Sequence, residues 1–168
     1  MNCFNTGEVY SGGIYTNTAY AGGIVGYDYY SQVKNCYNTG KLRLIYDSLG
    51  NTFCGGIAGY AESATTDCYN IGMVIGTNKA GEGIIGNGIP GANCYYLDTS
   101  TQSAEVNGIK SLTDAEMKTQ ASFANWDFLG TWTINRDDNG GYPALAWQGF
   151  DNVAASSDAT LSALKIGR

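Results

Sequence analysis

The segment Asn35-Cys36-Tyr37-Asn38-Thr39-Gly40-Lys41-Leu42 decides the fold, because the chain returns to it at nearly regular intervals. Copies start at Asn2, at Asp67 and, in decayed form, at Asn93. The cysteines of the four copies are spaced by 33, 32 and 26 residues along the chain: Cys3, Cys36, Cys68 and Cys94. Self-similarity at such a period indicates stacked copies of one supersecondary unit.

A second motif alternates with the first. Ala21-Gly22-Gly23-Ile24-Val25-Gly26-Tyr27 recurs from Cys54 to Tyr60 and, more loosely, from Gly81 to Asn87. Neither motif has the 3.6-residue apolar rhythm of a helix, and each is about as long as a strand. The interval between copies is too long for a hairpin but suits one coil of a solenoid. The sequence therefore predicts a mainly β protein: a right-handed parallel β-helix (β-solenoid) of about three coils with a small C-terminal α+β cap.

The paired C-Y-N-T-G-x-V and G-G-I-x-G-Y motifs resemble the GLUG-type repeats of bacterial cell-surface and secreted proteins, over roughly residues 1–98. This resemblance implies a β-helical stalk, extracellular or attached to the cell surface, that carries no catalytic residues. The third copy departs from the pattern, with Ile71 in place of Thr and Glu82 in place of Gly, so we expect a trimmed coil there. Because the chain starts inside a repeat, we take it as a piece of a longer protein whose signal and anchor lie elsewhere.

Three segments are expected: solenoid repeats at 1–98, a cap at 99–150, and at 151–168 a linker with the first strand of a truncated domain that resembles a cadherin-like β-sandwich. In the cap, Thr113 and Glu116 are spaced as a capping box for a helix running to about 122–124. Strands are expected at 126–128, 131–134 and 142–147. This segment holds all three tryptophans and resembles the stretch that closes GLUG arrays, so we expect it to cover the open last coil.

Composition excludes several classes of function. The 168 residues include no histidine, which rules out histidine-dependent catalytic units and imidazole metal sites on this chain. The net charge of −6 argues against a nucleic-acid partner. The absence of a long apolar run argues against membrane insertion. No cofactor is expected.

Two sets of repeat residues are expected to form structural ladders, in which equivalent side chains of successive coils stack. Cys3, Cys36, Cys68 and Cys94 should be interior free thiols, since parallel side chains one coil apart are poorly aimed for a disulfide. The second set consists of the turn asparagines, which tolerate left-handed backbone and can bond side chain to side chain: Asn5, Asn38 and Asn70.

Tyrosines are the candidate binding residues. Tyr27, Tyr29, Tyr30 and Tyr60 fall in the first two coils and, if they project outward, would contact a glycan or a protein. Alternatively, they pack over the coils and shield ladder edges. The turn at residues 137–140 has the composition of a calcium loop without its alternating spacing, so a plain turn is expected. The carboxylates of the repeats stand at unmatched positions, and no pair indicates an enzyme.

The sequence thus favours a non-catalytic structural or adhesive module acting as stalk or spacer in an extracellular bacterial protein. Two alternatives stay open: a carbohydrate-binding module that uses outward tyrosines, and a fragment of a β-helical polysaccharide-processing enzyme. Expected partners are glycans or host and surface proteins. Because the first coil has no neighbour below it, self-association through this open N-terminal coil is also expected.

Overall fold

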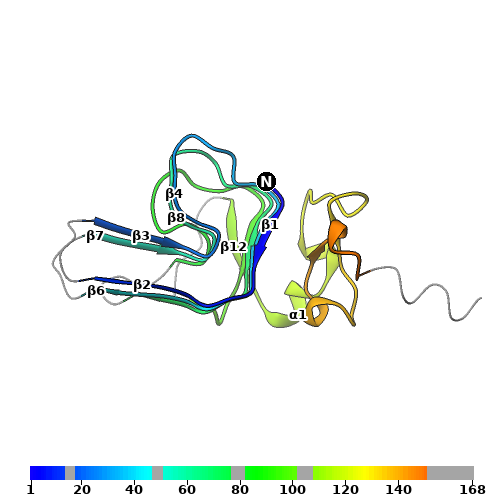
Figure 1. Ribbon diagram of the computed structural model, residues 1–168. Helices are drawn as coiled ribbons and strands as arrows, with labels where there is room; N and C mark the ends of the chain where they lie inside the picture. Colours follow the sequence, from blue (N-terminus) through cyan, green and yellow to red (C-terminus); the bar gives the residue numbers. More distant parts are fainter. Residues whose placement is uncertain (14–17, 47–50, 77–81, 102–107, 151–168) are drawn as a thin grey trace, which may run out of the picture.

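The computed structural model describes residues 1–13, 18–46, 51–76, 82–101 and 108–150. Equivalent segments of successive repeats lie side by side as parallel strands (Figure 1). The cysteine motif forms the largest sheet, in the order β1-β5-β9-β11-β12. Its strands are β1 (Cys3–Asn5), β5 (Cys36–Asn38), β9 (Tyr69–Asn70), β11 (Cys94–Leu97) and β12 (Ile109–Leu112).

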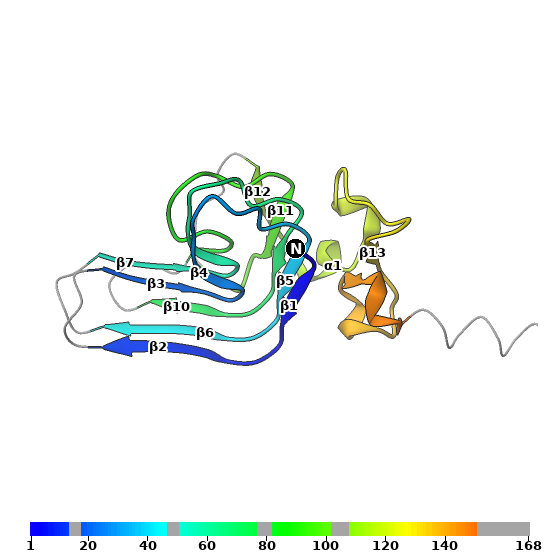
Figure 2. The ribbon, with the colours of Figure 1, turned by 45° about the horizontal axis from the view of Figure 1, so that its top comes forward.

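The rest of each coil forms shorter parallel sheets. One has three strands, β2 (Val9–Gly13), β6 (Leu42–Tyr46) and β10 (Val74–Gly76), which Figure 2 shows stacked on one another. Two sheets have two strands each: β3 (Thr18–Gly22) with β7 (Asn51–Gly55), and β4 (Val25–Asp28) with β8 (Ala58–Ala61). The third coil continues the last two sheets through isolated bridges, at Glu82, Ile85 and Gly88. The prediction of a mainly β protein is confirmed, and the repeats form several short parallel sheets.

The strand register reproduces the repeat period. Cys3 lies opposite Cys36, and Asn38 lies opposite Asn70. Because parallel strands are about 4.8 Å apart, equivalent side chains stack directly on one another. One buried core within the coils contains Cys36, Cys68 and Cys94 together with aliphatic side chains of the glycine motif. A second core lies between the β2-β6-β10 sheet and the β3-β7 sheet, with Ala21 and Cys54 on equivalent positions.

The two motifs meet inside the coil, which explains why both recur together. A Cβ atom on Gly56 would overlap the Asn70 side chain, and one on Gly23 would overlap Asn38. In the fourth copy of the cysteine motif, the tyrosine ring of Tyr96 occupies the asparagine position and lies against Gly83 in the same way. The second glycine of the Gly-Gly pair is therefore required by the close approach of the facing strand.

The turn residues differ from those expected. The ladder asparagines are the last residues of β1, β5 and β9, and each side chain accepts a hydrogen bond from the N–H two residues later, but their own backbone is not left-handed. The left-handed backbone instead falls on the residue before each buried cysteine, with φ of 53° at Asn35, 52° at Asp67 and 51° at Asn93. Asn and Asp tolerate this conformation because their short polar side chains bond locally.

A C-terminal unit follows the last repeat. Its elements are α1 (Asp114–Met117), the 3₁₀ turn η1 (Gln120–Ser122), β13 (Trp132–Thr133), η2 (Asn139–Gly141), β14 (Ala144–Leu145) and η3 (Ala146–Gln148). Strands β13 and β14 pair antiparallel. The capping box of Thr113 and Glu116 is confirmed. The expected helix end is wrong: α1 stops at Met117, because Thr119 has extended backbone and its hydroxyl bonds the carbonyl of Ala115.

Other details of this unit also differ from the expectation. The predicted strand at 126–128 is a turn, since the Asp127 carboxylate accepts hydrogen bonds from the backbone N–H groups of Leu129 and Gly130. The predicted strands at 131–134 and 142–147 shorten to β13 and β14. Segment 151–168, with its expected linker and cadherin-like strand, lies outside the described residues. No helix in the described part of the chain is long and apolar enough to cross a membrane.

The C-terminal unit packs along the side of the stack, and β12, which precedes it, pairs with β11 of the last coil. The outward side chains of the cysteine motif form a row of rings: Phe4, Tyr37, Tyr69 and Tyr95. Trp132 lies 5.9 Å from Tyr69 between ring centroids, Trp126 lies 5.8 Å from Tyr95, and Trp147 lies 5.9 Å from Phe4. Contacts with four successive strands place the unit beside β1 to β11, as Figure 1 shows. Of the expected cap at 99–150, β12 thus lies on the last coil and the segment that carries the tryptophans lies beside the stack.

Candidate functional site

Six aromatic side chains of the first two coils gather in one place, which we call the aromatic corner. They come from β3, β7, β4, β8 and the residues after β4: Tyr20, Phe53, Tyr27, Tyr60, Tyr29 and Tyr30.

Strand alternation and a sharp bend create this corner. Along β3, Ala19 and Ala21 are buried and Tyr20 points outward, as expected for successive side chains on opposite faces. The chain then bends at Gly22 and Gly23, where Cβ atoms would collide with neighbouring backbone. The outward faces of β3 and β4 therefore converge, and the rings of Tyr20 and Tyr27 meet edge to face at 5.0 Å.

The second coil repeats the arrangement in register. Tyr27 stacks on Tyr60 at 5.0 Å with an interplanar angle of 8°, and Tyr20 stacks on Phe53 at 5.7 Å with an angle of 15°. Two short ring stacks thus meet at a steep angle along the bend. Aromatic pairs of this geometry hold one another in place beyond the effect of area burial.

The outer part of the corner is open to solvent. Tyr29 is 69% exposed and Tyr30 is 72% exposed, and their rings meet edge to face at 4.8 Å. The Tyr27 hydroxyl donates a hydrogen bond to the Glu62 carboxylate, and this bond raises the pKa of Tyr27 to about 12. Tyr27 therefore keeps its proton at any physiological pH. The corner presents ring faces and phenol groups next to a carboxylate.

A buried carboxylate anchors the base of the corner. Asp28 is buried, and its oxygens accept from the backbone N–H of Ser31 at 3.0 Å and from the hydroxyl of Ser63 at 2.8 Å. Since Ser31 follows Tyr30 and Ser63 follows Glu62, these bonds fix the loops that carry the exposed rings. Asp28 has a structural role in this arrangement.

The structure brings together all four tyrosines predicted for contact with a glycan or protein: Tyr27, Tyr29, Tyr30 and Tyr60. The sequence analysis missed Tyr20 and Phe53 as members of the site. Their alternation with small residues, Ala19-Tyr20-Ala21 and Thr52-Phe53-Cys54, was the available signal. Tyr10, 65% exposed, lies on β2 in a different sheet.

The cysteines of the first motif are free thiols, and three of the four are interior. Cys36, Cys68 and Cys94 are fully buried, whereas Cys3 is exposed. The expectation of an interior position is therefore wrong for Cys3, because no described strand covers β1 on its outer side. Burial raises the pKa of Cys68 well above the usual 9.0 of a thiol, and it raises the pKa of Cys54 to about 12. Buried neutral thiols are poor nucleophiles.

The asparagine ladder is a continuous chain of amide hydrogen bonds. The Nδ2 group of Asn5 donates to the Oδ1 atom of Asn38 at 2.9 Å, and the Nδ2 group of Asn38 donates to Asn70 at 2.8 Å. Each amide also bonds the glycine two residues later, Gly7, Gly40 or Gly72, through that residue's N–H and carbonyl groups. These bonds satisfy the amides of Asn38 and Asn70, which are completely buried.

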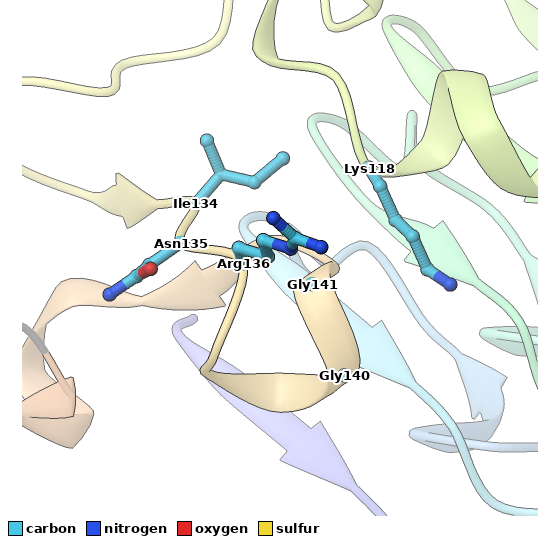
Figure 3. A pocket seen from close by; sticks show the side chains of 6 residues that line it. All are labelled: Lys118, Ile134, Asn135, Arg136, Gly140 and Gly141. Atoms are coloured by element: carbon cyan, nitrogen blue, oxygen red, sulfur yellow. The ribbon is translucent and has the colours of Figure 1, made fainter.

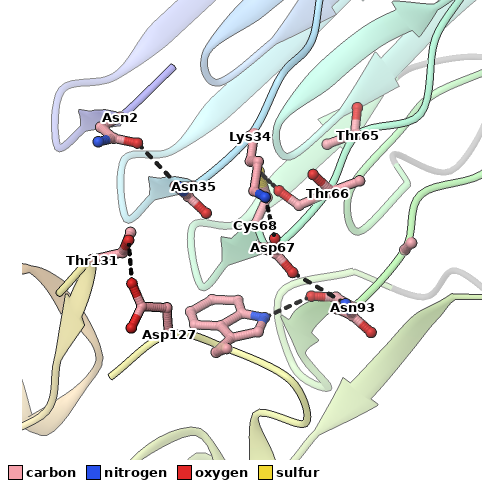
Figure 4. A network of polar contacts seen from close by, with 12 residues as sticks. Asn2, Lys34, Asn35, Thr65, Thr66, Asp67, Cys68, Asn93, Asp127 and Thr131 are labelled. Carbon is pink, nitrogen blue, oxygen red and sulfur yellow. Dashed lines mark hydrogen bonds and ion pairs between the residues drawn. The ribbon is translucent and has the colours of Figure 1, made fainter. Parts of the chain in front are cut away.

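A second polar ladder runs along the left-handed residues (Figure 4). Asn35 donates to the side chain of Asn2, and Asn93 donates to Asp67, both at 3.1 Å. Lys34 forms an ion pair with Asp67 at 3.5 Å. The C-terminal unit joins this ladder through Trp126, whose indole N–H donates to the carbonyl of Asn93 at 2.9 Å. These contacts connect neighbouring coils and hold the C-terminal unit on them.

A pocket of about 480 Å³ lies in the C-terminal unit (Figure 3). Its lining residues are Lys118, Ile134, Asn135, Arg136, Gly140 and Gly141. Lys118 is already paired, with Asp114 at 2.9 Å and with the Tyr142 ring at 4.6 Å. On the rim lies the turn at residues 137–140, which has the composition of a calcium loop. Its Asp138 carboxylate accepts a hydrogen bond from the side-chain amide of Asn135 at 3.0 Å. Within the described ranges, no three acidic or cysteine side chains come close enough to hold a metal ion.

Comparison with known proteins identifies one of the repeats. No curated protein and no solved structure matches the chain. The family model of the GLUG motif matches residues 17–43, a span that contains one Gly-Gly-Ile segment and one complete cysteine motif. The chain therefore carries a GLUG-type repeat.

Proposed function

We propose that the chain is a non-catalytic structural module, a short right-handed parallel β-helix that serves as a stalk or spacer in an extracellular multidomain protein. One observation carries the proposal: the characteristic side chains of the repeat bond or stack on their own copies in the neighbouring coil. The asparagines bond one another, the cysteines fill the core, and the outward aromatic row is covered by the C-terminal unit.

The carboxylates support the same proposal. Asp28 bonds Ser31 and Ser63, Asp67 bonds Lys34 and Asn93, and Glu62 bonds Tyr27. A catalytic acid and base must instead point at a common substrate position. These interactions favour a structural module over a polysaccharide-processing enzyme.

Hydrogen exchange of the full chain tests whether the module is a rigid spacer. A spacer should open as one unit, so the amides of β5, β9 and β11 should exchange through a common opening with one free energy. Independent opening of single coils would contradict the rigid spacer. Turnover of a polysaccharide panel that disappears in Glu62→Gln would contradict the non-catalytic role.

The aromatic corner favours a second candidate, a carbohydrate-binding function. Tyr29 and Tyr30 are each more than two-thirds exposed, so their aromatic rings and their phenol hydroxyl groups are open to solvent. Sugars offer apolar C–H faces and hydroxyl groups, and amphipathic rings suit both. The extracellular location implied by the family resemblance belongs to this proposal as well.

A glycan array with matched variants tests this second candidate. The double variant Tyr29→Ser/Tyr30→Ser should reduce binding to any recognised glycan by about tenfold or more, which corresponds to about 1.4 kcal/mol. Tyr10→Ser is the matched control, because Tyr10 is equally exposed but lies on another sheet. Equal losses in both variants, or no binding by the unsubstituted chain, would contradict a carbohydrate site at the corner.

A further inference from the structure

Two glycines of the first coil have much more room for a side chain than their equivalents in later coils. A Cβ atom on Gly7 would meet only the side chain of Asn5, at 3.6 Å, and one on Gly26 would meet only the carbonyl of Tyr20, at 3.3 Å. The first distance is an ordinary van der Waals contact, the second requires the Tyr20 carbonyl to move by a few tenths of an ångström, and neither residue has a left-handed backbone.

Their equivalents in later coils are glycines for a clear reason. A Cβ on Gly40 would collide with the carbonyl of Gly7, and one on Gly72 would collide with the carbonyl of Gly40. A Cβ on Gly59 would come within 2.5 Å of the Gly26 carbonyl oxygen. In each pair, the backbone of the preceding coil excludes the side chain. Gly7 and Gly26 therefore have the residue type that a preceding coil would require.

The side chains of the first coil give the same indication. Phe4 is 39% exposed where its counterpart Tyr37 is 1% exposed, and Cys3 is exposed where Cys36 is fully buried. The Oδ1 atoms of Asn38 and Asn70 each accept two hydrogen bonds, one of them from the asparagine of the preceding coil. For Asn5, the described residues supply only the bond from the N–H of Gly7.

From these observations we infer that the outer edge of β1, β2, β3 and β4 is a docking surface for one further coil of the same pattern, joined ahead of Asn2. The four strands are the terminal members of four separate sheets, so a coil placed here would continue each parallel ladder. The occupant must offer an asparagine amide to Asn5, a ring to Phe4 and a backbone carbonyl to Gly7. The inference rests on the stacked-coil architecture proposed above.

A second copy of the chain fits this surface less well. At the opposite end of the largest sheet, β12 offers Ser111 at the asparagine position and Lys110 at the aromatic position. Two first coils that face each other across a twofold axis would pair antiparallel, or with inner and outer faces exchanged. Neither arrangement gives the parallel register of the ladders. Self-association of the isolated chain would use the same edge without its specific contacts.

An added coil tests the inference directly. Residues 35–66 are copied and placed ahead of Asn2, so that Asn2 takes the place that Asp67 has after the natural second coil. The expected result is that alkylation of Cys3 slows by about tenfold or more, because Cys3 becomes interior as Cys36 is. Cys3 that remains as reactive as in the original chain would overturn the inference.

Alanine variants separate docking from folding. In the original chain, Gly7→Ala should leave the urea midpoint unchanged, whereas Gly40→Ala should lower it clearly. In the extended chain, Gly7→Ala should restore the reactivity of Cys3, and the exposed neighbour Thr6 serves as control through Thr6→Ala. Two results would overturn the inference. One is a lowered midpoint for Gly7→Ala in the original chain. The other is full protection of Cys3 in the extended chain that carries Gly7→Ala. The common opening of β5, β9 and β11 would be unaffected, so the spacer proposal stands or fails separately.

Discussion

Asn38 makes four hydrogen bonds with its side-chain amide: two with Gly40 and one each with Asn5 and Asn70. The amide is completely buried, so every one of these bonds replaces a bond to water. At the scale of single residues, the stack depends on amides that each serve two coils at once.

Asn38→Ala should lower the free energy of unfolding by about 3 kcal/mol, because it leaves buried partners without their bonds. Asn5→Ala is the matched control and should cost about 1 kcal/mol, since Asn5 is half-exposed and bonds only one other asparagine. Urea unfolding of both variants measures the difference. Equal losses would show that the ladder does not gain stability from stacking.

The thiols differ in exposure, and their reactivity should follow it. In native protein at pH 8, iodoacetamide should modify Cys3 rapidly and leave Cys54 and Cys68 unmodified, because burial raises the pKa of the latter two. Mass spectrometry of peptides measures the order, and all five cysteines should react in denaturant. In Cys3→Ser the fast reaction should disappear. Fast modification of Cys68 would contradict the buried ladder.

At the scale of elements, the C-terminal unit and the largest sheet stabilise each other. The Tyr69 hydroxyl donates to the carbonyl of Pro143 at 2.6 Å, and the Tyr37 hydroxyl donates to the Gln148 side chain at 3.0 Å. Trp132 is 1% exposed and packs against both of these tyrosine rings, which stack on each other. The strands of this sheet are only two to four residues long in the described chain, so lateral packing compensates for short ladders.

Trp132→Ala should therefore lower the free energy of unfolding by about 3–5 kcal/mol through the cavity it leaves. Trp147→Ala is the matched control, because Trp147 is 60% exposed, and it should cost less than about 1 kcal/mol. The midpoints of urea unfolding measure both losses, provided that the dependence of the free energy of unfolding on urea concentration is unchanged. A large effect at Trp147 together with a small one at Trp132 would contradict the packing described.

The sequence predicted some elements well because their signals are local. The repeat period alone predicts which residues face each other, such as Cys3 and Cys36, and the capping box predicts where α1 begins. The predicted end of α1 was wrong. The hydrogen bond from the Thr119 hydroxyl to the Ala115 carbonyl competes with continued helix, and the sequence does not reveal this bond. The lateral packing of the C-terminal unit was not predicted, because the outward Tyr37 looks the same in the sequence whether water or Trp132 covers it.

The candidate site could likewise be predicted only where the sequence carries a signal for the contact. Tyr27 and Tyr60 could be chosen because the glycine motif places them in register, whereas Phe53 meets Tyr60 only through the bend at Gly55 and Gly56. The angle of that bend depends on how closely two backbones approach, which a pattern of residue types does not encode.

At the scale of the whole molecule, buried neutral acids make stability depend on alkaline pH. Burial raises the pKa of Cys68 and Tyr69 well above their usual values of 9.0 and 10.0. In the unfolded chain these groups lose their protons near those usual values, while the folded chain keeps them. Their contribution is fully present below about pH 9 and decreases as the pH rises toward the folded pKa.

Between pH 9 and 10.5 the free energy of unfolding should therefore fall, by up to about 1.4 kcal/mol per pH unit for each ionising group. Urea midpoints at a series of pH values measure this slope. Cys54→Ala should reduce it, because the pKa of Cys54 is about 12 in the folded chain and Ala21 fills the equivalent position. A midpoint that is constant up to pH 10.5 would contradict the burial of these groups.

The lateral attachment of the C-terminal unit also has a consequence for biogenesis. Tyr37 meets Gln148 across 111 positions of the chain, and Tyr69 meets Pro143 across 74. Contacts this distant in sequence form slowly, since long loops must close first. During synthesis, which proceeds from the N-terminus, the aromatic row stays uncovered until the segment with Trp126 and Trp132 has emerged. We therefore expect the nascent repeats to be prone to aggregation until that segment has been translated and packs on the aromatic row.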